Sequence, residues 1–398
     1  MNPDLEKLFP YPFTRLDDLT AGLKQPASLP FINLSIGEPR HAAPEFVLDA
    51  LTRASRDLGS YPQSAGLPIF RSACANWLER RFGIGDEIID PESMVLPLSG
   101  TREGLFAFAQ AVIDRDRNAT VLMPNPFYQI YEGAALLAGA QPVYLNALPE
   151  NDFLPDLDAV SVEAWERCQL LYVCTPGNPT GAVMDLNYLR RILELSDRYD
   201  FVIASDECYS EIYFDEDKPP PSLLQACLLE GRDQLQNCAV FHSLSKRSSV
   251  PGLRSGFVAG DAEIIRRFRL YRSYHGCAMP VHHQLASVAA WNDDAHVAIN
   301  RSLYREKFAT AGNRVCEALD YAMPTAAFYL WAAVPVDDEL FASRLYSEQN
   351  VLVLPGSYLA RNTADGNPGK GRVRISLVAA RGECNEAAGR IVSMLSSL

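Results

Sequence analysis

Short apolar segments alternate with helical segments along the first two thirds of the chain, and this alternation restricts the folds that the chain can adopt. The apolar segments are too short for buried helices, so they indicate strands of a largely parallel sheet joined by crossover helices. The expected strands are Ser93–Pro97, Thr120–Met123, Leu170–Cys174, Phe201–Ser205 and Ala239–His242. The expected helices are Pro44–Leu58, Pro68–Phe82, Gly104–Val112, Tyr128–Leu137 and Leu186–Arg198. The pattern predicts an α/β fold in which helices sandwich a mostly parallel sheet.

The pattern changes after Pro280. A helical region to about Leu319 precedes three expected strands and a last helix, at Ala327–Val334, Val351–Pro355, Arg372–Leu377 and Asn385–Leu395. A chain of 398 residues usually divides into two domains. We therefore expect a large domain over residues 44–283 and a smaller α+β domain over residues 284–398. Residues 1–43 are expected to form an N-terminal arm and part of the smaller domain. The prolines of Phe9–Phe13 favour an extended arm over a helix, and Ile32–Ile36 is expected to be a short strand.

Composition narrows the classes of partner. The formal net charge of −13 disfavours nucleic acid and anionic membrane surfaces. No apolar run approaches the roughly 18 residues that span a bilayer, and no secretory signal pattern follows Met1. The 9 cysteines are scattered without a CxxC pair, which predicts reduced thiols in a cytoplasmic protein. We expect no metal site.

One lysine stands out by its setting. The segment Phe241–Gly256 places Lys246 among hydroxyl groups, with Arg254 eight positions later. A lysine in this setting can form a Schiff base with an aldehyde cofactor, while Ser243, Ser245 and Arg254 hold a phosphate. These are the requirements of pyridoxal 5′-phosphate (PLP). Lys246 alone would more often be a surface residue in a serine-rich loop, so the interpretation depends on further elements upstream.

Three such elements follow expected strands, where open α/β sheets bind their ligands. Backbone N–H groups of Gly100, Thr101 and Arg102 begin a helix and form an anion site. Tyr128 is placed to lie flat on a pyridine ring. Asn178 is held by a turn dense in proline and glycine. Taken singly, these are more often a helix cap, a core aromatic residue and a structural turn.

A fourth element is Asp206, which ends a buried strand. A buried carboxylate is costly unless it meets a cation, and the protonated pyridine nitrogen of PLP is such a cation. Tyr209 and Asn178 are both placed to hydrogen-bond the 3-oxygen of the ring. We therefore predict Lys246, Asp206 and Tyr209 as catalytic residues of a PLP enzyme.

The order of these elements resembles the class I/II aminotransferases of fold type I, above all in Ser-x-Ser-Lys followed by Pro-Gly-x-Arg-x-Gly. The resemblance extends from Ile36 to Arg374. It implies that Arg374 binds the substrate α-carboxylate, a choice that strand spacing alone leaves open between Arg372 and Arg374. It also implies that Gly37 contacts this carboxylate. Tyr61 would reach the phosphate of the neighbouring subunit, in a homodimer with shared active sites.

Three stretches resemble one branch of the family, the succinyldiaminopimelate transaminases of lysine biosynthesis: Leu8–Leu16, Ser245–Asp261 and Tyr274–His283. That branch implies small amino and oxo acids as partners, with glutamate and 2-oxoglutarate as the amino couple. Aspartate, alanine and aromatic aminotransferases remain alternatives, as does a PLP carbon–sulfur β-lyase. The candidates for binding a distal carboxylate are Arg15, Arg40 and Arg102.

Overall fold

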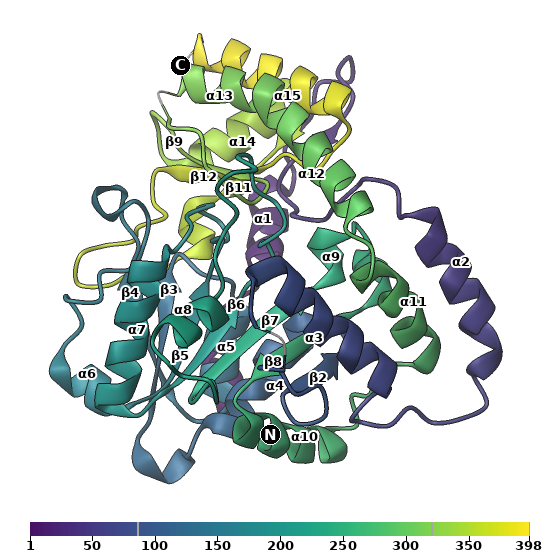
Figure 1. Ribbon diagram of the computed structural model, residues 1–398. Coiled ribbons are helices and arrows are strands. Elements are labelled where there is room, and N and C mark those ends of the chain that lie inside the picture. Colours follow the sequence, from purple (N-terminus) through teal and green to yellow (C-terminus); the bar gives the residue numbers. More distant parts are fainter. Residues whose placement is uncertain (86, 320, 398) are drawn as a thin grey trace.

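The computed structural model describes residues 1–85, 87–319 and 321–397, and a seven-stranded sheet lies at its centre (Figure 1). The strand order is β2-β8-β7-β6-β5-β3-β4. The strands are β2 (Val95–Leu98), β3 (Thr120–Asn125), β4 (Gln141–Asn146), β5 (Cys168–Cys174), β6 (Val202–Asp206), β7 (Cys238–Ser243) and β8 (Gly256–Gly260). Neighbouring strands from β4 to β7 are parallel, whereas β8 is antiparallel to β7 and to β2. The predicted α/β class with a mostly parallel sheet is confirmed.

Helices cover both faces of this sheet, which explains why its strands are apolar on both sides. One face packs against α4 (Thr101–Val112), α5 (Ile130–Leu137) and α10 (Ala262–His275). The other packs against α3 (Pro68–Phe82), α7 (Leu186–Tyr199), α8 (Leu223–Leu229) and α11 (Val281–Trp291), with α2 (Glu45–Ala54) lying on α11. Two short helices, α6 (Val162–Glu166) and α9 (Leu244–Arg247), complete this part of the chain.

The C-terminal part builds smaller sheets, seen above the main sheet in Figure 1. Strands β11 (Leu354–Pro355), β12 (Arg372–Ser376) and β9 (Tyr329–Ala333) form an antiparallel sheet in that order. Its helices are α12 (Ala295–Lys307), α13 (Asn313–Ala318), α14 (Asp338–Gln349) and α15 (Arg381–Leu395). Strand β1 (Ile32–Asn33) pairs in parallel with β10 (Val351–Leu352). This long-range pairing supports our proposal that residues 1–43 contribute to a smaller domain over residues 284–398.

The N-terminal segment differs from the sequence prediction. Phe9–Phe13 was expected to be extended, but helix α1 (Pro12–Thr20) begins inside it. Proline is suited to the first helical position, because its missing N–H would have no partner there and its φ is already helical. Two strands, β4 and β8, were not predicted. No described helix is long and apolar enough to cross a membrane.

Aromatic packing supports the strand that carries the lysine segment. Trp77 on α3 is 1% exposed, and its ring lies 4.8 Å from His242 on β7 and 4.8 Å from Trp291 on α11. His242 directly precedes Ser243, so this contact fixes the end of β7 from behind.

We expect Trp77→Ala to lower the free energy of unfolding by about 3–5 kcal/mol, because it leaves a large cavity under β7. Urea denaturation of the apoprotein measures this loss. Asn76→Ala, on the exposed face of the same helix, should change the stability by less than about 0.5 kcal/mol. Equal losses in both variants would contradict the role assigned to Trp77.

Candidate active site

A cavity of about 430 Å³ lies where the carboxyl ends of the central strands meet the N-terminal segment and the C-terminal sheet. Nearly all the predicted site residues line it: Gly37, Thr101, Arg102, Tyr128, Asn178, Asp206, Tyr209, Ser243, Ser245, Lys246, Arg254 and Arg374. Strands β3, β5, β6 and β7 run in one direction, so the residues after them emerge at one edge of the sheet. Arg254 reaches the same edge because β8 is antiparallel and starts beside Ser243.

Asp206 lies at the base of the cavity and is 4% exposed. Its Oδ2 accepts a hydrogen bond from the Tyr131 hydroxyl at 2.7 Å, and its Oδ1 accepts one from the Cys208 N–H at 3.3 Å. Burial raises the pKa of the Asp206 carboxyl. No cation forms an ion pair with it among the described residues. A protonated ring nitrogen would supply the missing positive charge, which is the fit expected for PLP.

Lys246 extends into the cavity from α9, and its Nζ donates a hydrogen bond to the Gly37 carbonyl at 2.6 Å. Burial lowers the pKa of Lys246 to about 8. The Cys208 thiol and the Glu38 carboxylate oppose this shift, whereas the Arg374 charge adds to it. A lysine with a depressed pKa supplies neutral amine near neutral pH, as attack on an aldehyde requires.

Hydroxyl groups, backbone N–H groups and one guanidinium form an anion cradle beside Lys246. The Ser243 hydroxyl donates to the Ser255 carbonyl at 3.1 Å and lies 3.0 Å from that of Ser245. Arg254 donates to the carbonyls of Pro251 at 2.9 Å and Ser99 at 3.3 Å, and it has no carboxylate partner among the described residues. Such a cradle suits a phosphate.

Gly100 does not line the cavity but shapes this cradle from behind. Its φ of +86° lies in the left-handed region, and a Cβ there would fall 2.2 Å from Nη2 of Arg254. Glycine is therefore required for the close approach of Arg254 to the start of α4.

Arg374 links the C-terminal sheet to the main sheet. It lies on β12, where Nη1 donates to the Asn178 side-chain oxygen at 3.0 Å and Nη2 donates to the Ser35 carbonyl at 2.7 Å. Its Nε has no hydrogen-bond partner among the described residues. Arg372 does not line the cavity and donates instead to the Trp331 carbonyl at 3.2 Å. The structure thus shows that Arg374 lines the cavity and Arg372 does not, a choice that strand spacing alone left open.

Several lining residues were not predicted, among them Tyr11, Cys208 and Tyr329, and neither was Tyr131, which lies outside the lining. Tyr131 holds Asp206, and the Tyr329 hydroxyl lies 2.8 Å from that of Tyr209. Tyr11 and Cys208 line the cavity, and the Cys208 Sγ lies 3.0 Å from the Thr101 hydroxyl. No spacing rule points to Tyr329 or Tyr11, because both reach the cavity only through tertiary packing. Tyr131 follows Tyr128 by one helical turn, a signal that was available.

Tyr61 lies outside the cavity and is fully exposed. This placement brings it to no site within its own chain. Its expected role toward a neighbouring subunit therefore stays a prediction.

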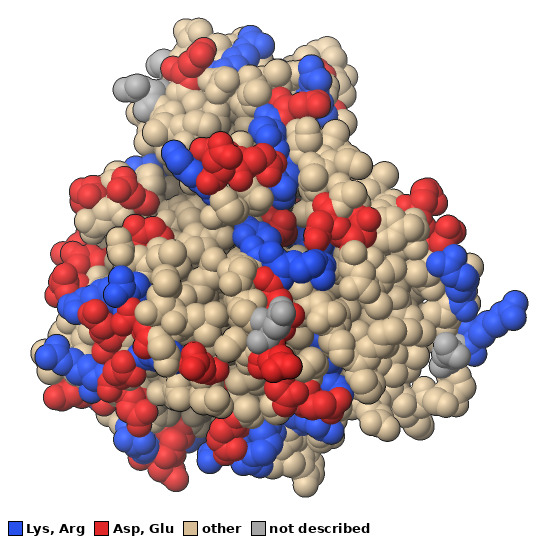
Figure 2. All heavy atoms as spheres, in the orientation of Figure 1, with Lys and Arg blue, Asp and Glu red and all other residues tan. Residues whose placement is uncertain are grey.

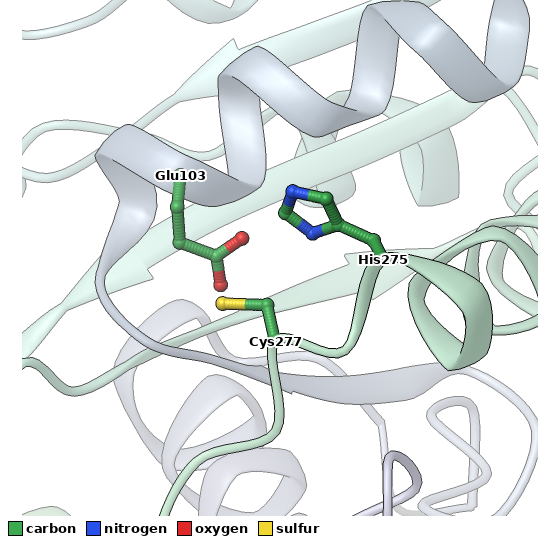
Figure 3. A group of neighbouring side chains, drawn as sticks. All are labelled: Glu103, His275 and Cys277. Atoms are coloured by element: carbon green, nitrogen blue, oxygen red, sulfur yellow. The ribbon is translucent and has the colours of Figure 1, made fainter.

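One group of metal-ligating types occurs among the described residues: Glu103, His275 and Cys277 (Figure 3). Both oxygens of Glu103 accept hydrogen bonds from Arg272, at 2.9 and 2.6 Å, and one accepts from the Ser99 N–H at 2.8 Å. The buried guanidinium neutralises the carboxylate and would repel a cation. We therefore assign Glu103 a structural task, which is to hold the start of α4 that forms the anion cradle.

Similarity to known proteins agrees with this geometry. The model of the family described as aminotransferase class I and II matches residues 30–391. The chain belongs to this family. Its members depend on PLP, and so does this aminotransferase.

Relatives and solved structures align over almost the whole chain. The LL-diaminopimelate aminotransferase of Nitratidesulfovibrio vulgaris is 34% identical over 396 residues, 98% of each chain. That of Dehalococcoides mccartyi is 33% identical over 383 residues, 94% of this chain and 93% of the relative. The crystal structure of an aminotransferase from Neisseria meningitidis matches with a TM-score of 0.95 and 48% identity, over 99% of this chain and 100% of that one. The aminotransferase AspB of Helicobacter pylori gives 0.90 and 35%, over 98% and 100%.

We expect Gly100→Ala to weaken PLP binding at least about tenfold, because the added Cβ displaces the Arg254 guanidinium from the cradle. Absorbance titration of the apoprotein with PLP gives the Kd. Gly382→Ala, where an added Cβ meets nothing within 4 Å, is the matched control and should bind PLP normally. Unchanged affinity in Gly100→Ala would show that Arg254 is not part of the phosphate site.

Proposed function

We propose that this aminotransferase exchanges amino groups between N-succinyl-LL-diaminopimelate and 2-oxoglutarate, giving N-succinyl-2-amino-6-oxopimelate and glutamate in lysine and diaminopimelate biosynthesis. The observation that carries the proposal is the charge of the cavity. Its lining includes Arg102, Lys246, Arg254 and Arg374, but among the described residues only one carboxylate, Asp206. Both substrates of the couple carry two or more carboxylates. Because the chain has a net charge of −13 and acidic and basic side chains are interspersed over the face in Figure 2, attraction must come from these local cations.

The far end of the substrate distinguishes the acylated from the free amino acid. The relatives described above are named for LL-diaminopimelate, which keeps a second ammonium group at that end. We assign Asp206 to the cofactor ring, so the described lining residues offer this ammonium no anionic partner. Succinylation removes the ammonium and adds a carboxylate. The cationic lining therefore favours the acylated substrate, with LL-diaminopimelate as the competitor to test.

Arg102 is the best candidate for the distal carboxylate. Arg15 forms an ion pair with Glu339 at 3.6 Å, and neither Arg15 nor Arg40 lines the cavity. Arg102 lines it, and within the described part of the chain its side chain donates only to hydroxyl groups, those of Tyr128 and Tyr11, both at 2.6 Å. The remaining N–H donors of its guanidinium are available for a carboxylate.

Each side chain of the site has a task in this reaction. When bound, PLP supplies an aldehyde that links to a lysine and a ring that accepts electrons. Lys246 would hold the cofactor at Nζ and move the proton of the substrate α-carbon. Asp206 opposes the positive charge of the ring nitrogen, and Tyr209 with Asn178 would hydrogen-bond the ring 3-oxygen.

The remaining side chains orient the cofactor and the substrate. Ser243, Ser245 and Arg254, with the N–H groups at the start of α4, would hold the phosphate. Tyr128 would lie against the ring. Arg374 would clamp the α-carboxylate common to all the substrates, near Gly37.

We also propose a cytoplasmic homodimer with shared active sites. Tyr61 is fully exposed, and the exposed side chains of Ile69, Leu270 and Tyr274 add apolar surface that a second copy would bury. In such a dimer, Tyr61 would contact the cofactor phosphate in the active site of the partner subunit.

Replacing Lys246 tests the assignment of the chemistry. We expect Lys246→Ala to fold, to bind PLP without a borohydride-reducible bond, and to lose at least about 10³-fold in kcat, because it removes the amine that we assign to moving the α-proton. Lys370→Ala, an exposed lysine, should keep both properties. Near-normal turnover in Lys246→Ala would contradict the proposed mechanism.

Substrate selection is tested with purified enzyme and 2-oxoglutarate. We expect kcat/KM for N-succinyl-LL-diaminopimelate to exceed that for LL-diaminopimelate, aspartate, alanine or phenylalanine by at least about 100-fold. Arg102→Gln should lower the value for the succinylated substrate about tenfold or more while changing that for alanine little, because alanine has no distal carboxylate. Arg15→Gln is the control. A simple amino acid or LL-diaminopimelate as the better donor would leave the family assignment standing and refute the succinylated substrate. Pyruvate release from cystathionine would indicate a β-lyase.

A further inference from the structure

The loop that follows β1 is joined to the lysine segment through Gly37 and His41, and the His41 carbonyl accepts a hydrogen bond from the Ser249 hydroxyl at 2.8 Å. The Gly37 carbonyl accepts a hydrogen bond from Lys246 Nζ at 2.6 Å. Four residues later, Nδ1 of His41 lies 2.7 Å from the side-chain oxygen of Asn300 on α12. The Asn300 Nδ2 in turn donates to the backbone carbonyls of Lys246 at 3.0 Å and Arg247 at 3.2 Å. Both the side chain and the main chain of Lys246 are therefore tied to one loop.

A second lysine ends this series of hydrogen bonds. Nζ of Lys307, at the end of α12, lies 2.7 Å from Nε2 of His41 and donates to the Val378 carbonyl at 3.1 Å. Lys307 is 2% exposed, and no carboxylate forms an ion pair with it among the described residues. Burying a cation without a carboxylate is costly, so its neutral partners must hold it.

The Lys307 ammonium group at one end of the series and the main-chain carbonyls at the other end fix the direction of every hydrogen bond between them. An ammonium group only donates, so Nε2 of His41 must accept and its proton must lie on Nδ1. Nδ1–H then donates to the Asn300 oxygen, which turns the Asn300 amide so that its Nδ2 donates to the main-chain carbonyl of Lys246. These carbonyls only accept. Each donor in the series thus meets an acceptor, in one arrangement only.

We propose that Lys307, His41 and Asn300 are positioning residues that hold the catalytic lysine in register with the loop that binds the substrate carboxylate. None of the three lines the cavity, so they act through Lys246 and Gly37. The series joins the N-terminal loop, α12 and α9, and it keeps Lys246 aimed at one point while the loop contacts the substrate. This inference rests on the proposed role of Lys246 as the cofactor lysine.

The series carries a pH dependence whose sign follows from His41. The other charged and titratable groups that face the pair are Arg40 on the loop, Tyr304 on α12, and Glu383 and Cys384 on α15. Burial and the charge of Lys307 lower the pKa of His41, so His41 is neutral at neutral pH and its Nε2 accepts. When the pH falls through this lowered pKa, Nε2 gains a proton and can no longer accept from Lys307. Burial also lowers the pKa of Lys307, to about 8.

The test compares variants that break the series with one that keeps it. His41→Leu removes both of its side-chain hydrogen bonds, and Lys307→Met removes the ammonium but keeps an apolar stem. His41→Gln keeps an acceptor for Lys307 and a donor for Asn300, without a titrating ring. His296→Gln is the matched control, because His296 also joins α12 to the α9 segment, through Ser248 at 2.8 Å, but does not touch the loop.

The measurements on the holoenzyme are kcat and KM for glutamate from pH 5 to 9, and the pH at which the absorbance of the lysine-linked cofactor changes. We expect His41→Leu and Lys307→Met to lower kcat about tenfold with KM changed less than about threefold, and to move the absorbance transition by about half a pH unit or more. His41→Gln should keep kcat within about threefold of wild type and lose the acid-side fall that His41 causes. His296→Gln should keep the wild-type pH profile.

Three results would overturn the inference: a wild-type absorbance transition in both breaking variants, equal losses in His41→Gln and His41→Leu, or the same spectral change in His296→Gln. If a breaking variant does not fold, His41→Gln decides, since a folded His41→Gln that retains the wild-type acid limb refutes the role of His41. Failure of the proposed function is separate, because it would appear as a retained reducible cofactor bond in Lys246→Ala.

Discussion

The buried carboxylate of Asp206 is the constraint on which the rest of the site depends. It ends a central strand, beneath a cavity lined by cations, yet the hydrogen bonds that reach it come from a phenol and a backbone N–H. Burial raises its pKa, so the ionised form needs a positive partner from outside the chain. PLP, on which this family depends, brings that partner in its ring nitrogen. A cofactor ring held at this point explains the positions of the neighbouring polar groups.

The three arginines that line the cavity lie at different places in it, and we assign each one a different group to bind. Arg254 lies at the anion cradle, Arg374 at the junction of the two sheets, and Arg102 beside the hydroxyl groups of Tyr11 and Tyr128. All three donate to carbonyl, amide or hydroxyl oxygens, and no carboxylate of the described residues forms an ion pair with them. In a chain of net charge −13, these local cations would provide the attraction for the polycarboxylate substrates that we propose.

The sequence predicted the central fold well where strands were apolar and flanked by helices, as with Leu170–Cys174, observed as β5. It failed at β4, an edge strand with mixed exposure, and at β8, whose start lies inside the lysine motif. It also failed at α1, where proline was taken as a helix breaker although it begins the helix. The two strands were missed because a local pattern cannot show whether a segment has a partner strand elsewhere in the chain. Helix α1 was missed for a local reason, the misread role of its first proline.

The sequence by itself determined the α/β class and the order of the elements that carry the chemistry, because strand ends and tight turns are local features with local signals. Only the tertiary structure decided between Arg372 and Arg374, brought Tyr131 and Tyr329 into the site, and joined Lys307 and His41 to the lysine segment. Those contacts join residues from separate elements, many of them far apart in the chain, whose directions depend on how whole elements pack. Spacing along a chain fixes which face a residue shares with its neighbours, whereas packing alone fixes what that face meets.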